Sequence, residues 1–135
     1  MENRITTVFI VDDDASARKG LGRLIQAAGY NVIIYADALI FLNEIREMPN
    51  SCIVLDMRMY NLTGSELHKE LISKGITIPV IVVTADQDSE TRLKAKRAGA
   101  AAFFRKPVDG PALLDAIEWT IAQHRQEGNG QKQES

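Results

Sequence analysis

The sequence contains one cysteine, Cys52, and it lacks both a long apolar run and a marked excess of charge of either sign. A single cysteine excludes an internal disulfide, and its place inside an apolar run predicts a small core residue in a reducing compartment. No stretch reaches the roughly 18 apolar residues of a membrane-spanning helix, and the short apolar run near the start ends in acids, unlike a signal peptide. The net charge of −2 favours neither nucleic acid nor a membrane as a bulk partner. We therefore expect a cytoplasmic protein without a membrane partner.

What the sequence does contain is a regular alternation of apolar runs and helical periods. Its 135 residues, 45% apolar and 25% charged, suit one ordinary globular domain. Short apolar runs predict strands at 7–11, 31–35, 51–56, 78–84 and 101–104. The segments after them have helical spacing, at 16–28, 37–48, 65–74, 89–98 and 110–125. Five strand–helix pairs predict an α/β fold, a doubly wound five-stranded parallel sheet with helices on both faces.

The end of the chain differs from the rest. Residues 123–135 are polar and show no periodicity, so they predict a disordered tail or an interdomain linker beside a folded domain at 1–122. In the preceding helix the apolar residues define an inner face, which places Trp119 nearly opposite, on the outside. Neither His68 nor His124 has a partner at metal-binding spacing, and both are expected at the surface.

Polar residues gather where the predicted strands end. The first strand runs into three acids, the third ends in an acid, the fourth ends in a hydroxyl and the fifth is followed by a lysine: Asp12, Asp13 and Asp14, then Asp56, Thr84 and Lys106. Parallel strands end at one edge of a sheet, where such folds bind ligands. Clustered carboxylates repel unless a proton or a cation intervenes, and hard cations such as Mg²⁺ prefer carboxylate oxygens. Acids, a metal, a lysine and a hydroxyl together could hold a phosphoryl group that a carboxylate attacks.

Four motifs of this rim resemble those of the receiver domain of bacterial two-component response regulators. They are "VDDD" after the first strand, "LDMRM" with "TG" at the third, "VVTA" at the fourth and "FFRKP" at the fifth. The resemblance covers about residues 6–122. In the order and spacing of these motifs the chain is similar to receivers that precede a helix-turn-helix output domain. It implies a flavodoxin-like sheet of strand order 2-1-3-4-5 and a cis bond between Lys106 and Pro107.

The resemblance also implies roles for individual residues. A sensor histidine kinase would pass a phosphoryl group to Asp56. Mg²⁺, or Mn²⁺, would be held by Asp12, Asp13, Asp56 and the main-chain carbonyl of Arg58. Lys106 and Thr84 would contact the phosphoryl group, and Phe103 would be the switch aromatic that turns inward with Thr84.

The implied activity is that of a signalling switch rather than a metabolic enzyme. The domain would assist only its own phosphotransfer and slow autodephosphorylation. Its phosphorylation would alter the surface of 89–98, 101–104 and 110–125, and that surface would control homodimerisation or an output domain, which is expected to be transcriptional. DNA would be contacted only through an output domain that these residues do not contain.

Other interpretations of the same residues stay open. A strand-terminal acid such as Asp56 is often a turn former, Asp14 and Asp37 could cap helices, and Lys106 could be a solvated charge. An Asp-x-Asp after the first strand is also found in phosphatases of the haloacid-dehalogenase type, in which Asp12 rather than Asp56 would carry the phosphoryl group. A flavin-binding domain has a similar winding, but its phosphate loop is not acidic.

Three further positions raise questions that the pattern leaves open. Tyr60 stands where many receivers have proline, so the loop after Asp56 is expected to be less stiff. Arg58 and Asp86 each lie two residues beyond a site residue, and they either pair over the site and slow hydrolysis or are independent surface charges. Trp119 is either an interface anchor or a lone exposed aromatic.

Overall fold

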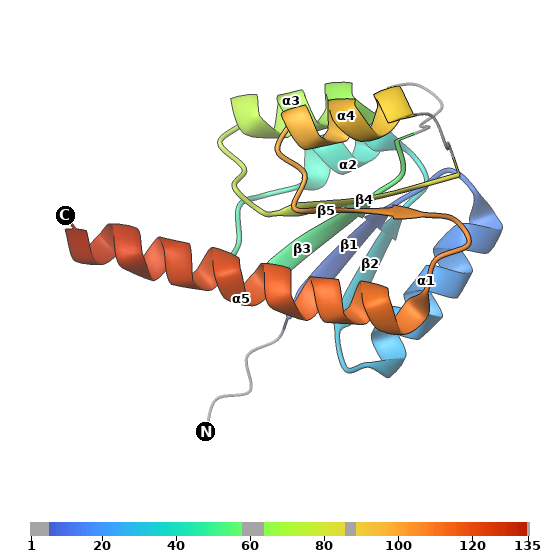
Figure 1. Cartoon of the computed structure of the whole chain (residues 1–135), viewed down its shortest axis with the longest axis horizontal. Helices are drawn as coiled ribbons and strands as arrows, with labels where there is room; N and C mark the ends of the chain where they lie inside the picture. Colours follow the sequence, from blue (N-terminus) through green and yellow to red (C-terminus); the bar gives the residue numbers. More distant parts are fainter. Residues whose placement is uncertain (1–5, 58–63, 86–88, 135) are drawn as a thin grey trace.

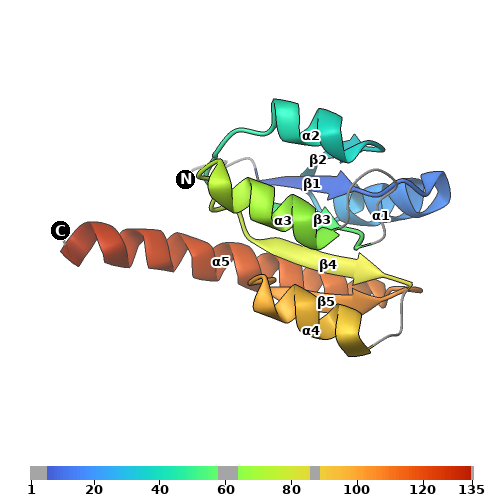
Figure 2. The same ribbon diagram turned by 90° about the horizontal axis from the view of Figure 1, so that it is seen from above.

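Five parallel strands form the centre of the molecule. The computed structural model describes residues 6–57, 64–85 and 89–134. The strands are β1 (Thr7–Val11), β2 (Asn31–Tyr35), β3 (Ser51–Leu55), β4 (Val80–Thr84) and β5 (Ala102–Arg105). Their order in the sheet is β2-β1-β3-β4-β5, and the arrows in Figure 2 all point the same way. The predicted fold class and strand order are confirmed.

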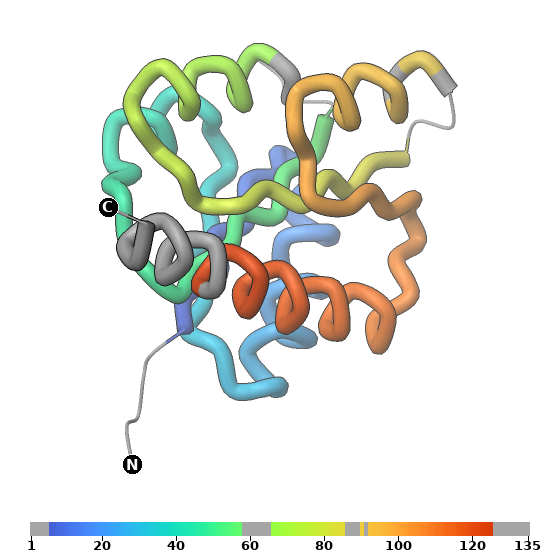
Figure 3. Tube along the Cα trace, turned by 60° about the vertical axis from the view of Figure 1, so that its left-hand side comes forward, coloured from blue at the N-terminus to red at the C-terminus, as the bar shows by residue number. Residues whose placement is uncertain are grey.

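Helices cover both faces of this sheet. They are α1 (Ala15–Ala27), α2 (Ala38–Glu44), α3 (Gly64–Ser73), α4 (Ser89–Arg97) and α5 (Gly110–Glu134). Figure 1 shows α2, α3 and α4 above the sheet and α1 and α5 below it, and the trace in Figure 3 shows the same two layers. The sheet therefore separates two apolar cores, one on each face.

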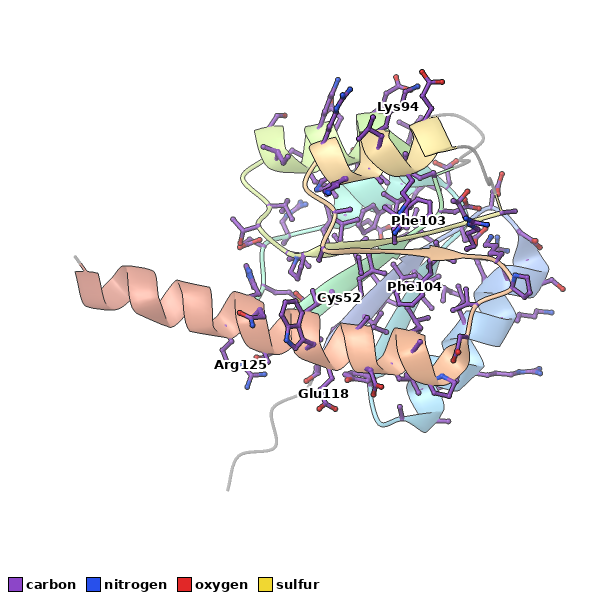
Figure 4. The ribbon with its side chains drawn as sticks, in the orientation of Figure 1. Cys52, Lys94, Phe103, Phe104, Glu118 and Arg125 are labelled. Atoms are coloured by element: carbon purple, nitrogen blue, oxygen red, sulfur yellow. The ribbon has the colours of Figure 1, made fainter. Side chains whose placement is uncertain are left out.

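The two cores follow from the alternation of side chains along buried strands. On β1, Phe9 and Val11 pack against α2, α3 and α4, while Val8 and Ile10 pack against α1 and α5. All residues of β1, β3 and β4 are buried, because a strand that is covered on both faces has no side for water. Phe103 and Phe104 point to opposite faces of β5, one into each core, as the strand period predicts (Figure 4).

Side-chain caps define where two of the helices begin. Asp14 caps α1, accepting a hydrogen bond of 3.0 Å from the Ser16 amide, and Asp37 caps α2 through the Leu39 amide at 2.7 Å, so both expected caps are confirmed. The predicted helix at 37–48 was too long. It ends at Glu44, because Ile45 adopts an extended conformation and buries its side chain in the core.

The end of the chain is helical. Residues 123–135 were expected to form a disordered tail or an interdomain linker, and α5 continues through them to Glu134. A helix that is already nucleated by a packed segment extends at little cost, and Gln, Glu and Lys favour it. No apolar periodicity marks this extension, so the pattern could not reveal it. The domain boundary at 122 stays a prediction.

On α3 the expectation for His68 was wrong. It was expected at the surface, yet it is only 9% exposed and lies beside the buried Leu67 and Leu71 on the inner arc of the helix. Ile72 of the same helix is 59% exposed. Trp119 on α5 is exposed, as expected, and His124 is half-buried.

Candidate functional site

The carboxyl ends of the central strands bring two acids together. Asp12 follows β1 and Asp56 follows β3, which are neighbours in the sheet. Their amides continue the strand hydrogen bonding, Asp12 donating to the Tyr35 carbonyl at 3.1 Å and Asp56 to the Val11 carbonyl at 3.0 Å. Both residues are buried, Asp12 with 2% and Asp56 with 6% of their surface exposed. The sheet thus holds two carboxylates rigidly at the edge of the core.

Lys106, which follows the edge strand β5, contacts both of these acids. It follows β5, where its amide donates to the Thr84 carbonyl at 2.9 Å and its bond to Pro107 is cis, as the resemblance implied. Its Nζ lies 2.8 Å from Oδ2 of Asp12 and 3.1 Å from Oδ2 of Asp56. One ammonium therefore neutralises part of the repulsion between two buried carboxylates.

The charge state of Lys106 follows from these contacts. Burial by itself would lower the pKa of the ammonium. The hydrogen bonds and charges of Asp12 and Asp56 outweigh that effect and raise the pKa above its usual value. The ammonium is consequently charged at neutral pH, and it stands where an anionic group beside Asp56 would meet it.

Asp13 adds a third carboxylate at the solvent side. Carboxylate oxygens of Asp12, Asp13 and Asp56 lie within 4.8 Å of one another, and Asp13 is exposed. An all-oxygen set with an open side fits a hard divalent cation that keeps several waters. Arg58, expected to add its main-chain carbonyl, lies outside the described residues, as do Tyr60 and Asp86.

Two local contacts orient Asp12. Its Oδ1 accepts a hydrogen bond of 2.9 Å from the Asp14 amide, and its main-chain carbonyl accepts one of 2.8 Å from Nη1 of Arg18. Arg18 was not among the residues predicted for the site. The signal that could have identified it is its charge, because a cation near a helix N-terminus is unfavourable unless something holds it there.

Thr84 and Phe103 occupy the two strands next to the acids. Thr84 ends β4 and is fully buried, and Phe103 pairs with Val82 of the same strand. The Phe103 ring is half-buried, and the Arg92 guanidinium of α4 lies 5.8 Å from its centroid. Each sequence-predicted site residue that the structure describes therefore lies at this edge or on a strand that leads to it.

The parallel sheet of order β2-β1-β3-β4-β5 and the acidic edge together define a receiver-like α/β domain. A family model described as "Response regulator receiver domain" matches residues 8–118, and the chain belongs to this family. It is a family of signalling domains rather than of classical enzymes. Within the described part of the chain, no helix is long and apolar enough to cross a membrane.

Relatives of known name align with most of this chain. The response regulator protein TodT of Pseudomonas putida is 33% identical over 117 residues, which are 87% of this chain and 52% of TodT. The transcriptional regulatory protein FixJ of Azorhizobium caulinodans is 34% identical over 121 residues, 90% of this chain and 57% of its own. The chain thus spans about half the length of the curated relatives it matches.

Solved structures of response regulators also superpose on this chain. The response regulator StyR superposes with a TM-score of 0.84 at 41% identity, covering 96% of this chain and 67% of that one. The crystal structure of FixJ-N gives a TM-score of 0.79 at 34% identity, covering 88% and 95% of the two chains.

Proposed function

We propose that the domain is a phosphorylation-activated switch in which Asp56 accepts a phosphoryl group from a sensor histidine kinase. One observation carries this proposal: the Lys106 ammonium contacts the carboxylates of both Asp12 and Asp56 at the open edge of the sheet. A buried nucleophile beside a fixed cation is suited to receive an anionic group. The family membership supports the same function.

In the proposed transfer one bond to phosphorus forms and one breaks. An oxygen of the Asp56 carboxylate attacks the phosphorus, the phosphorus–nitrogen bond of the donor phosphohistidine breaks, and its electron pair stays on the ring nitrogen. The ring carries or takes up one proton and so leaves as neutral imidazole. Lys106 and the Thr84 hydroxyl would bind oxygens of the transferred group. Asp12, Asp13 and Asp56, with the Arg58 carbonyl, would hold Mg²⁺ or Mn²⁺. The bound metal supplies positive charge to the phosphoryl oxygens. Water later hydrolyses the acyl phosphate slowly.

The output of the proposed switch is a changed surface. Thr84 and Phe103 would move toward the phosphoryl group, and α4, β5 and α5 would respond. This surface would control homodimerisation or a transcriptional output domain joined through residues 123–135. The chain covers only 56% and 57% of two relatives named transcriptional regulatory proteins, which supports such an output. A cytoplasmic location follows from the same function.

Incubation with Mg²⁺ and acetyl phosphate tests the core of the proposal. Intact mass spectrometry should show a gain of one phosphoryl group that is lost in Asp56→Asn. Asp14→Asn is the matched control, because asparagine also caps helices and Asp14 has no proposed role in transfer. A phosphoryl group carried by Asp12 would instead support the phosphatase alternative and reject this one.

A further inference from the structure

A cavity lies at the end of the molecule opposite the acidic site. It has a volume of about 360 Å³ and is formed by the last turn of α3, the start of β4 and the end of α4. In Figure 1 these two helix ends lie together at the left, whereas the strand arrows point to the right. A volume of this size falls at the lower end of the range for small-molecule sites, roughly 300–1,000 Å³.

Two glycines leave this space open. Gly75 ends α3 with φ of 78° and Gly99 ends α4 with φ of 96°, a backbone conformation that side chains rarely adopt. A Cβ at Gly75 would meet nothing within 4 Å, and one at Gly99 would meet only the His68 ring, at 4.0 Å. The cavity therefore results from how the two helices end.

The walls of the cavity are mainly apolar, and they include the polar side chain of His68. Leu71, Ile78 and Val80 are almost fully buried core residues, and the hydroxyl of Thr77 is already bonded to Glu47. His68 is about nine-tenths buried and lines the cavity, and within the part of the chain that the structure describes its ring has no hydrogen-bond partner. Within that part of the chain no buried side-chain nitrogen or oxygen lacks a partner, so the ring nitrogens of His68 reach the solvent of the cavity, where a ligand could replace water as their hydrogen-bond partner.

The charge around the cavity selects the kind of ligand. The lining holds no acid, lysine or arginine. Both flanking helices present their C-terminal, partly negative ends here, which disfavours an anion. Among the described residues, the Glu47 carboxylate borders the lining at Thr77, but it already accepts hydrogen bonds from the Thr77 amide and hydroxyl and is not free for a cation. Burial lowers the pKa of His68, so the ring is neutral at pH 7 and offers one N–H donor and one acceptor nitrogen.

We propose that this cavity binds a small neutral molecule that has an apolar body and one hydroxyl or N–H group hydrogen-bonded to His68. The apolar body would contact Ile72, which is 59% exposed, and the half-buried Pro79, while Leu71, Ile78 and Val80 lie in the core behind them. Ala98 and Gly99 place the end of α4 in the same wall. The site is separate from the acidic edge and does not depend on phosphorylation.

Titration of the ¹⁵N-labelled full chain with para-cresol, without Mg²⁺ or phosphodonor, tests the proposal by amide chemical shifts. We expect saturable shifts confined to residues around the cavity, among them Leu71, Val80 and Gly99. The methyl ether of para-cresol, which no longer donates a hydrogen bond, should bind roughly tenfold more weakly, the loss of about one hydrogen bond. Benzoate, an anion of similar size, should bind more weakly still.

His68→Leu keeps an apolar body of similar size and removes the polar group. It should weaken para-cresol binding by roughly tenfold and abolish its advantage over the ether. His124→Leu, which changes the half-buried histidine of α5 outside the cavity, should leave binding unchanged. If His68→Leu does not fold, Ile72→Ala at the exposed rim should still reduce affinity at least about twofold, from lost apolar contact.

Several results would overturn the proposal. They are the absence of saturable shifts, equal binding of para-cresol by His68→Leu and the wild type, and tighter binding of benzoate. Unchanged affinity in Ile72→Ala would have the same meaning. Shifts of the cavity amides that depend on protein concentration alone would assign the cavity to a second copy of the chain instead.

Discussion

At the scale of single residues, the three carboxylates of the acidic edge differ in what holds them. Asp12 and Asp56 are buried and share the Lys106 ammonium, whereas Asp13 is exposed yet lies within 4.8 Å of both. Charges at such separations repel by about 1 kcal/mol even in a water-like dielectric. Asp13 therefore costs stability without a cation and contributes to binding when one is present.

Replacing Asp13 by asparagine separates these two effects. In chelator, Asp13→Asn should be more stable than the wild type by up to about 1 kcal/mol, because one repulsive charge is lost. A cation at 100 times its Kd stabilises by about 2.7 kcal/mol, so a tenfold weaker site loses about half of that gain. Urea unfolding with and without Mg²⁺ measures both, with Asp14→Asn as control. A variant that gains as much from Mg²⁺ as the wild type would exclude Asp13 from the metal site.

Cys52 is a fully buried residue of the core. Burial raises the pKa of its thiol to about 12, and Figure 4 places it between the sheet and α5. We expect iodoacetamide at pH 8 to leave the native protein unmodified and to label it fully in urea, because only the thiolate reacts. The unfolded thiol ionises near pH 9 and the folded one only near 12, so this group stabilises the fold below pH 9 and its contribution is lost as the pH rises through that interval. Rapid native labelling, measured by mass, would contradict this.

These residues also mark what the sequence could predict. Asp12, Asp56 and Lys106 were found because parallel strands end at one edge, so topology alone brings them together. Arg18 and His68 were missed, since their surroundings depend on which neighbouring side chains pack against them. A helical pattern distinguishes an inner from an outer face, but it does not show where the last turn of α3 borders a cavity.

At the scale of elements, α4 and β5 meet through one defined contact. The Arg92 guanidinium lies 5.8 Å from the centroid of the half-buried Phe103 ring. Such a contact at an exposed site is worth about 0.5–1 kcal/mol. In the proposed switch Phe103 turns inward, so this contact stabilises the form in which the ring has not yet moved.

Removal of that contact should favour the switched form. We expect Arg92→Ala to be phosphorylated by acetyl phosphate roughly two- to fivefold faster, the equivalent of 0.5–1 kcal/mol. Arg97→Ala removes an exposed arginine from the same helix and should leave the rate unchanged. A rate in Arg92→Ala equal to that of the wild type would show that the ring is not held by this contact.

At the scale of the whole molecule, the strand order and both helical layers followed from the alternation of apolar runs and helical periods. The edge strand β2 is more exposed than the other predicted strands, with Ile34 49% exposed, yet its apolar composition still identified it. The extension of α5 to Glu134 could not be predicted, because its residues carry no apolar face and a helix without one leaves no periodic signal.

Two buried residues near the middle of α5 indicate how much of that helix the domain requires. Thr120 and Ile121 are 3% and 4% exposed, and Arg125 donates a hydrogen bond of 3.0 Å from Nε to Oδ1 of Asn50. A chain ending at Arg125 retains every buried residue that the structure describes, so it should unfold in urea within about 0.5 kcal/mol of the full chain. A chain ending at Trp119 should lose about 3 kcal/mol or more, because it lacks Ile121. Equal phosphorylation of the full chain and the longer truncation would agree with a self-contained domain. A large loss of stability on removing 126–135 would show instead that the extension of α5 is part of it.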